Sequence, residues 1–394
     1  MKFENSANIP FDVLIDRRGT NCSKWDDSPC EIKADDMLPM WTADMDFACP
    51  AAVIESMRAR LEHPIFGYYA LPERYKESII RWQARRFGSD IHPEHIIPVA
   101  SVLGGVAMAI QALTAKGDAI LVSTPGYHAF FHAIQNNGRR MVTSPLIQEE
   151  DSFRMDYERM EKQIEEENVK LFILCSPHNP TGRIWTEDEL THLVDICWKH
   201  SVYIISDEIH ADMTLTHPFL PLLNIADPRA EKLTVALYAP TKTFNIAGLC
   251  TAYAIIKDAD LSIRFQNALL ASGLKVKNTL GVEALMAAYE QCDAWVDQLQ
   301  EYLLKNAKFA VDFIEKKIPS LHAYVPEATY FLWLDFSGTG LSQSEFVRKM
   351  EYEAHIVVTP GDSFLGGDHF IRLVAACPRS RLADALNRMK KIFQ

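Results

Sequence analysis

Five short segments of this 394-residue chain place chemically useful groups directly after apolar runs of strand character. The runs HIIPVA, DAILVST, VKLFILCS, SVYIISD and LTVALYA lead, respectively, to the glycine turn SVLGGVAMAI and to Tyr127, Asn179, Asp207 and Lys242. The carboxyl ends of parallel strands meet at one edge of a sheet, so we expect these groups to lie close together. A helix start, an aromatic ring, an amide, a carboxylate and an amine on one rim suit a planar, anionic, nitrogen-containing ring as the ligand.

Each of these side chains also has an ordinary structural explanation when taken alone. A loop lysine such as Lys242 is normally solvated, and Asn179 in HNPTG could serve only as a turn residue, because Asn-Pro is a strong turn signal. Asp207 could cap the DEIHAD segment, or its carboxylate could face a protonated ring nitrogen and keep that ring an electron sink. Tyr127 could stack on the same ring or cover the end of the sheet.

The glycine turn SVLGGVAMAI opens a predicted helix after a strand. The backbone N–H groups of Val102 and Leu103 could there bind a phosphate with help from the helix dipole. The alternative is a tight turn whose glycines serve only helix packing. The segment matches neither the dinucleotide-binding glycine pattern nor the P-loop, so binding of a dinucleotide or of ATP gains no support.

The elements that must position these groups alternate along the middle of the chain. Short apolar runs are separated by amphipathic stretches, a pattern that predicts an α/β fold with a mostly parallel sheet wrapped by helices. One predicted helix covers about Asp156 to Asn168, and another, TEDELTHLVDICWKH, begins with a capping box formed by Thr186 and Glu189.

The two ends of the chain have a different character. The first 45 or so residues are irregular and rich in Pro, Asp and Trp, whereas a long helical pattern begins near Ala294 and leads to mixed strands and helices. This pattern predicts a smaller α+β domain that both ends build together. The predicted division is an N-terminal segment 1–45, a large domain 46–290 and a C-terminal small domain 291–394.

Composition narrows the classes of function. The net charge of −12 and the pI of about 5.6 disfavour nucleic acid and anionic membranes as partners. The N-terminus has no apolar core of a secretory signal, and no apolar run reaches the ~18 residues of a membrane span. The eight cysteines form no C-x-x-C pair, which favours a reduced, cytoplasmic protein. Cys175, Cys197 and Cys250 lie in apolar runs, so we expect them to be buried.

Histidine pairs raise the question of a metal site. His92 and His95 stand in HPEH, and His128 and His132 stand in YHAFFH. Neither pair has an evident third ligand, so the sequence predicts no metal.

The motifs SPHNPTGR, SDEIHAD and APTKTFNIAGL together resemble pyridoxal-phosphate enzymes of the aspartate aminotransferase fold, also called fold type I. More narrowly, they resemble the MalY/PatB-type cystathionine β-lyase, or C–S lyase, subgroup. RRGTNCSKWD, LPMWTADMDFACP, HPIFGYY, EATYFLWLDF and FIRLVAACPRSRL extend the resemblance from about Arg17 to Arg388. It implies a large domain with a mostly parallel seven-stranded sheet and a smaller α+β domain formed by both chain ends.

The resemblance assigns the cofactor, pyridoxal 5′-phosphate, to the five segments. Lys242 would bind it covalently through its amine and then act as the base at the substrate Cα. Asp207 would pair with the ring nitrogen, Tyr127 would stack on the ring, and Asn179 would bind the ring oxygen. His210 would either help at that oxygen or only brace Asp207.

The same resemblance implies the phosphate and substrate contacts. The phosphate would be held by the N–H groups of Val102 and Leu103, by Thr241, and by Tyr68 of the partner subunit, which implies a homodimer. Arg372 would bind the substrate carboxylate. The substrate-binding side would be lined by Trp41, Ala43, Asp44 and Tyr330.

One departure bears on the reaction. Many aminotransferases carry a phosphate-binding arginine at the position of Cys250, and the lyase subgroup lacks that arginine. The expected reaction is therefore α,β-elimination of L-cystathionine or a related cysteine S-conjugate to a thiol, pyruvate and ammonia. The first alternative is an aminotransferase, which passes the amino group of an amino acid to a keto acid. The second is a regulatory or interaction protein that retains the cofactor.

Overall fold

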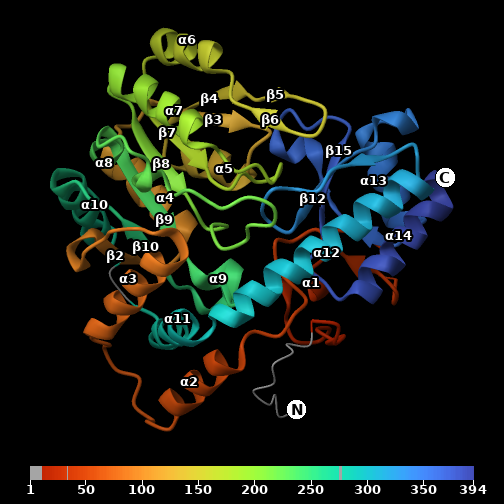
Figure 1. Cartoon of the computed structure of the whole chain (residues 1–394), viewed down its shortest axis with the longest axis horizontal. Coiled ribbons are helices and arrows are strands. Elements are labelled where there is room, and N and C mark those ends of the chain that lie inside the picture. Colours follow the sequence, from red (N-terminus) through yellow and green to blue (C-terminus); the bar gives the residue numbers. More distant parts are fainter. Residues whose placement is uncertain (1–10, 33, 275–276) are drawn as a thin grey trace.

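The computed structural model describes residues 11–32, 34–274 and 277–394, so the first ten residues of the predicted N-terminal segment lie outside the described residues. A seven-stranded sheet forms the centre of the larger part of the molecule, in the strand order β2-β10-β9-β8-β7-β3-β4 (Figure 1). Only β10 runs antiparallel to its neighbours, which confirms the prediction of a mostly parallel sheet. The strands are β2 Ile96–Val99, β3 Ala119–Thr124, β4 Arg140–Pro145, β7 Val169–Cys175, β8 Tyr203–Asp207, β9 Thr234–Tyr238 and β10 Ala252–Ile255.

Helices cover both faces of this sheet, which explains why every residue of β3 and β9 is buried. The helix α6 begins at Tyr157 and ends at Glu167, as predicted, and the capping box of Thr186 and Glu189 is present at the start of α7. The helices of this part are α2 Ala51–Leu61, α3 Glu73–Phe87, α4 Val102–Leu113, α5 His128–Asn136, α6 Tyr157–Glu167, α7 Glu187–Lys199, α8 Arg229–Leu233, α9 Pro240–Thr243, α10 Ala259–Ala271 and α11 Thr279–Gln291. Shorter elements are β5 Ile147–Gln148, β6 Phe153–Arg154, η1 Pro93–His95, η2 Leu222–Asn224 and η3 Ala247–Leu249.

The smaller part contains a four-stranded sheet in the order β11-β12-β15-β14. The early strand β1 (Leu38–Pro39) pairs in parallel with β13 (Ile356–Val357), so the beginning of the chain packs against its end. The other elements are α1 Ser23–Asp26, β11 His322–Ala323, β12 Phe331–Asp335, η4 Ser337–Thr339, α13 Gln343–Tyr352, β14 Thr359–Pro360, η5 Gly361–Phe364, β15 Phe370–Val374 and α14 Arg379–Phe393.

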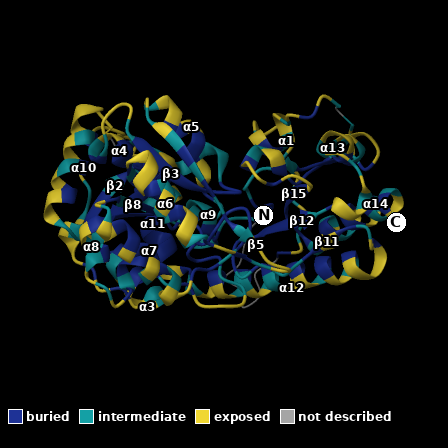
Figure 2. Ribbon diagram, turned by 90° about the horizontal axis from the view of Figure 1, so that it is seen from above, coloured by how far each residue is buried: buried dark blue, intermediate teal, exposed yellow. Residues whose placement is uncertain are grey.

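The helix α12 (Asp293–Lys317) runs along both parts of the molecule (Figure 2). Near its start, Trp295 and Leu299 belong to a hydrophobic core shared with α3 and α11, whereas Ala310 and Ile314 belong to the core of the smaller part. The described helices, α12 included, all lack the combination of length and apolar character that a membrane crossing requires. The domain boundaries near residues 45 and 290 stay a prediction.

Candidate active site

The five strand-end segments meet at one cavity of about 210 Å³ at the carboxyl edge of the large sheet. Nine of the residues proposed from the sequence line it: Ala43, Val102, Leu103, Tyr127, Asn179, Asp207, His210, Thr241 and Lys242. Seven further residues that the sequence did not propose as ligand contacts also line it: Ala100, Ser101, Phe130, Cys175, Ile209, Ala247 and Cys250. The expectation that the residues after these five strands lie close together is therefore met.

Lys242 lies in the short helix α9, directly after strand β9. Its side chain is partly buried, and its Nζ donates a hydrogen bond of 2.6 Å to the carbonyl oxygen of Ala43. Loss of water around the amine lowers the pKa of Lys242 to about 8, with the charge of Arg372 acting in the same direction and the carboxylates of Asp44 and Asp207 opposing it. This lysine is therefore not an ordinary solvated loop residue.

Asp207 ends strand β8 and is almost completely buried. Its Oδ1 accepts a hydrogen bond of 3.1 Å from the backbone N–H of Ile209, so the turn-capping explanation is partly correct. Among the described residues, no arginine, lysine or histidine forms an ion pair with this carboxylate. Burial raises its pKa to about 7, because the cost of removing water from the carboxylate outweighs the hydrogen bond from Ile209 and the charge of Lys242.

Asn179 and His210 line the same cavity as Asp207. The His210 ring is buried and contacts the edges of the Tyr330 and Phe331 rings, with ring centroids 5.9 and 5.4 Å away. Burial and the charges of Lys242 and Arg372 lower its pKa to about 3, so the imidazole is neutral. Its Nδ1 has no hydrogen-bond partner, and no described hydrogen bond joins it to Asp207, so a ligand atom is the better partner for it.

The start of helix α4 also lines the cavity. Ser101 caps the helix by accepting a hydrogen bond of 3.0 Å from the N–H of Gly104. The first N–H groups of a helix, here those of Val102 and Leu103, have no acceptor within the helix and are free to bind an anion. Thr241 lines the same cavity and brings a hydroxyl group.

The expectation that Cys250 is buried is wrong. Its side chain is exposed and lines the cavity, and its backbone is left-handed, with φ +46°. Strand β10 begins only at Ala252, so the apolar stretch has not yet entered the sheet at this residue. Cys175 and Cys197 are buried as expected.

Arg372 lies in strand β15 with only 3% of its surface exposed. Its Nη1 donates to Asn179 Oδ1 at 3.0 Å, and its Nη2 donates to the carbonyl oxygen of Trp41 at 2.9 Å. The guanidinium lies 4.4 Å from the centre of the Phe331 ring, and its Nε has no partner. Burial lowers its pKa to about 10, so it stays charged at neutral pH. A buried cation whose described partners are all neutral is a strong site for a carboxylate.

The remaining residues proposed for the substrate have different surroundings. Ala43 lines the cavity itself, whereas Asp44 forms an ion pair of 2.6 Å with Arg17. Trp41 donates from its ring nitrogen to the carbonyl oxygen of Lys24 at 3.2 Å. The hydroxyl of the buried Tyr330 has no hydrogen-bond partner.

Tyr68 does not line the cavity of its own chain. It is fully exposed between α2 and α3, and Leu61, Ile65 and Phe66 beside it are more than half exposed. A group of large apolar side chains exposed together is typical of a protein interface.

Comparison with known proteins identifies the family. The family model for class I and II aminotransferases matches residues 36–389. The chain belongs to this family. Members share the fold seen here, and the resemblance to fold type I pyridoxal-phosphate enzymes and to the MalY/PatB-type subgroup is confirmed.

Two curated relatives in the family cover nearly the whole chain. Cystathionine β-lyase PatB of Bacillus subtilis is 38% identical over 96% of this chain and 98% of its own length. Protein MalY of Escherichia coli is 33% identical over 94% of this chain and 95% of its own length.

Two solved structures have the same architecture. One is a pyridoxal-phosphate-bound protein from Clostridium difficile, which is 40% identical to this chain and superposes with a TM-score of 0.95. The match covers 98% of this chain and 100% of the Clostridium protein. Cystalysin from Treponema denticola, which contains pyridoxal 5′-phosphate, is 32% identical, with a TM-score of 0.93 and coverage of 97% and 98%.

Proposed function

We propose that this chain is a pyridoxal-phosphate-dependent C–S β-lyase that cleaves L-cystathionine or a related cysteine S-conjugate to a thiol, pyruvate and ammonia. The observation that carries the proposal is that Lys242 and Asp207 line one cavity, while Arg372 donates a hydrogen bond to Asn179 in the wall of the same cavity. The names of the relatives PatB and MalY, together with the absence of an arginine at Cys250, favour elimination over amino transfer.

Three polar side chains of the cavity fit this cofactor. The buried carboxylate of Asp207, which accepts from the N–H of Ile209, would also face a protonated ring nitrogen. The free Nδ1 of His210 and the amide of Asn179 would face the ring oxygen. Tyr127, whose ring lines the cavity, would stack on the cofactor ring.

The anionic end of the cofactor fits the start of α4. The N–H groups of Val102 and Leu103 and the hydroxyl of Thr241 would bind the phosphate. Tyr68 of the partner subunit would complete this set in a homodimer, and its full exposure in the single chain leaves it accessible for that role.

Bound pyridoxal phosphate supplies a ring that takes up the electron pair left on Cα when the substrate loses its α-proton. The chain supplies the base, the anchor and the counter-charge. With a pKa of about 8, about a tenth of Lys242 amines are neutral at pH 7 and able to accept that proton. Arg372 holds the substrate carboxylate and so fixes which bond at Cα faces Lys242. The thiolate on Cβ then leaves with the electron pair of the C–S bond.

Incubation of the purified protein, loaded with pyridoxal phosphate, with L-cystathionine in the absence of any keto acid tests the proposal. The expected products are pyruvate and a free thiol, and Lys242→Ala should form neither. Amino transfer to an added keto acid without thiol release would instead identify an aminotransferase. Retention of both Lys242 and Asp207 argues against a role that is only regulatory.

The finer features of the proposal concern assembly and location. A homodimer is expected to bury Ile65 and Phe66, and light scattering would detect it as twice the chain mass of 44.7 kDa. None of the eight cysteines, all of which lie in the described part of the chain, forms a disulfide, in keeping with the cytoplasmic location that we propose.

A further inference from the structure

The loop Trp41–Phe47 contacts both charged groups of the proposed reaction. The carbonyl oxygen of Trp41 accepts a hydrogen bond of 2.9 Å from Arg372, and that of Ala43 accepts one of 2.6 Å from Lys242. The position of this loop therefore determines how the amine and the guanidinium are presented to the cavity.

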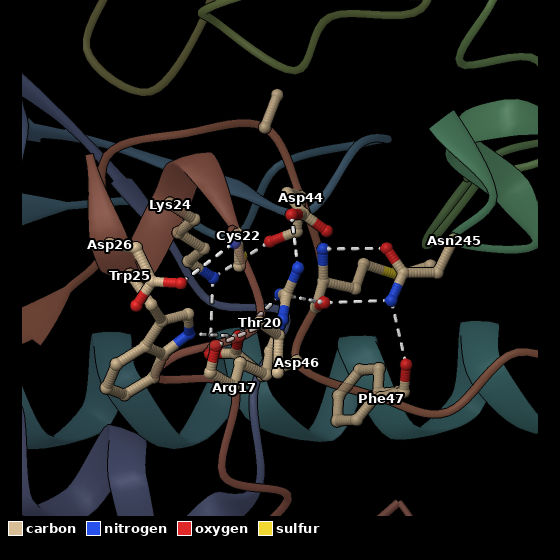
Figure 3. Close-up of polar contacts among 12 residues, drawn as sticks. Arg17, Thr20, Cys22, Lys24, Trp25, Asp26, Asp44, Asp46, Phe47 and Asn245 are labelled. Carbon is tan, nitrogen blue, oxygen red and sulfur yellow. Dashed lines mark hydrogen bonds and ion pairs between the residues drawn. The ribbon is translucent and has the colours of Figure 1, made fainter. Parts of the chain in front are cut away.

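Asn245 holds this loop from the turn that carries Lys242 (Figure 3). Its Nδ2 donates to the carbonyl oxygens of Met45 at 2.8 Å and Phe47 at 2.7 Å, and its Oδ1 accepts from the N–H of Met45 at 3.2 Å. Only an amide side chain can donate to two carbonyl oxygens and accept from one N–H at the same time. Aspartate has no N–H to donate and leucine has no polar atom, so neither could replace Asn245. Its backbone is left-handed, with φ +56°, a conformation that asparagine tolerates better than most residues.

A separate cluster holds the other side of the loop. The buried carboxylate of Asp46 lies 2.9 Å from Arg17, 3.2 Å from Lys24 and 2.8 Å from Arg381, and it accepts a hydrogen bond of 3.1 Å from the ring nitrogen of Trp25. These partners come from the N-terminal segment and from α14, so they fix the loop to the smaller part of the molecule. Asn245 fixes it to the turn of the lysine.

We propose that Asn245 is a positioning residue that keeps the carbonyl oxygen of Ala43 against the amine of Lys242. The two segments are joined by two neighbouring connections: Lys242 to Ala43, and Asn245 to Met45 and Phe47. If the Asn245 contacts are lost, the hydrogen bond from Lys242 to Ala43 must order the loop alone, and water then reaches the Lys242 amine. The inference rests on the proposed role of Lys242 as the base, but the contact itself is a property of the chain without cofactor.

The ionisation of Lys242 in the cofactor-free protein tests this directly. Acylation of the protein with a limiting amount of acetic anhydride over a range of pH, followed by mass spectrometry of the Lys242 peptide, gives the midpoint at which the amine becomes reactive. Burial is the largest cause of the low pKa of about 8, ahead of the opposing Asp44 and Asp207 and the assisting Arg372. We therefore expect the midpoint to move upward in Asn245→Gly and Asn245→Asp, with labelling below the midpoint reduced by about threefold or more, equivalent to half a pH unit.

The two substitutions have complementary strengths. Asn245→Gly keeps the left-handed backbone and adds no charge, and Asn245→Asp keeps the shape but loses both N–H donors. If Asn245→Asp does not fold, Asn245→Gly alone decides. In the loaded enzyme, the pH profile of kcat should move in the same direction as the labelling midpoint.

Asn224→Ala is the matched control. The Asn224 Nδ2 also donates two hydrogen bonds, to the carbonyl oxygen of Phe87 and to Ser89 Oγ, both at 3.0 Å, and the residue does not line the cavity. We expect it to lower the thermal midpoint while leaving the labelling midpoint unchanged. Folded Asn245 variants with a wild-type labelling midpoint, or an equal shift in Asn224→Ala, would overturn the proposal. An enzyme that transfers amino groups instead of cleaving C–S bonds would still show the shift, so the two failures are distinguishable.

Discussion

Replacing Asp207 with asparagine should have opposite effects on the protein with and without its cofactor. Burial moves the pKa of this carboxyl from 3.8 to about 7. The folded state thus holds the proton more tightly than the unfolded state, and the stability of the cofactor-free protein falls as the pH rises from 3.8 to about 7. A shift of about 3 units corresponds to roughly 4 kcal/mol at 1.36 kcal/mol per unit, and this full cost is present above pH 7.

Asparagine removes this cost because it carries no charge and its Oδ1 can still accept from Ile209. The cofactor-free variant should therefore melt at a higher temperature than the wild type at about pH 8, with less than half of that free-energy gain left at about pH 5. Its affinity for pyridoxal phosphate should fall by about 10- to 100-fold, because a charge-assisted hydrogen bond of roughly 1.5–3 kcal/mol is lost. Thermal melting and equilibrium dialysis measure the two effects.

Glu208→Gln provides the control, since it removes a buried carboxylate from the adjacent residue. Glu208 binds Ser206, Tyr238 and the N–H of Leu222, and it does not line the cavity. Its substitution should leave cofactor affinity unchanged. An Asp207→Asn protein that is no more stable than the wild type without cofactor, and binds the cofactor as tightly, would refute the electrostatic argument.

The remaining predictions concern the ends of the cavity, the partner subunit and pH. Arg372→Lys keeps the charge but loses the planar fork, so KM for the amino-acid substrate should rise by about tenfold or more with a smaller change in kcat; steady-state kinetics measures both. Cys250→Arg adds a cation beside the start of α4 and should slow cofactor release, measured after dilution; faster release would contradict the phosphate assignment. Tyr68→Phe should speed that release while the mass from light scattering stays the same. Because the base must be neutral once the substrate has freed Lys242 from the cofactor, kcat should fall about tenfold for each pH unit below the Lys242 pKa of about 8, and a flat kcat profile there would exclude this amine as the base.

The parts of the fold that follow from local sequence were predictable. Buried parallel strands are apolar over their whole length, so β3 and β9 stand out as runs, and the residues after them fall at one edge of the sheet. The helix predicted for 156–168 is present as α6, with Asp156 capping its start and Asn168 ending it. Each cap binds backbone groups of the adjacent turn only, so local sequence is enough to predict it. The order of strands and the residues that follow them are therefore enough to predict where the cavity lies.

The contacts that depend on distant parts of the chain were not predictable from local pattern. The Lys242 amine meets a carbonyl 199 residues earlier, and Arg372 reaches an amide 193 residues earlier, and no spacing rule encodes such pairs. Asn245 lay within the motif TKTFNIAGL, yet only the left-handed backbone and the neighbouring loop reveal its role. The prediction that Cys250 is buried failed because an apolar sequence does not show at which residue a strand begins.

The loop Trp41–Phe47 belongs to a stretch of chain that precedes the large sheet and is not part of it. Most residues proposed to hold the cofactor follow the sheet strands, whereas the loop and the Arg372 strand are proposed to form the side that meets the substrate. Because Lys242 and Arg372 bind this loop through backbone carbonyl oxygens, side-chain substitutions in the loop can alter which amino acid is accepted while both contacts are kept. During divergence from a common ancestor, substrate range and even reaction outcome can drift through one short segment, while cofactor dependence is inherited unchanged.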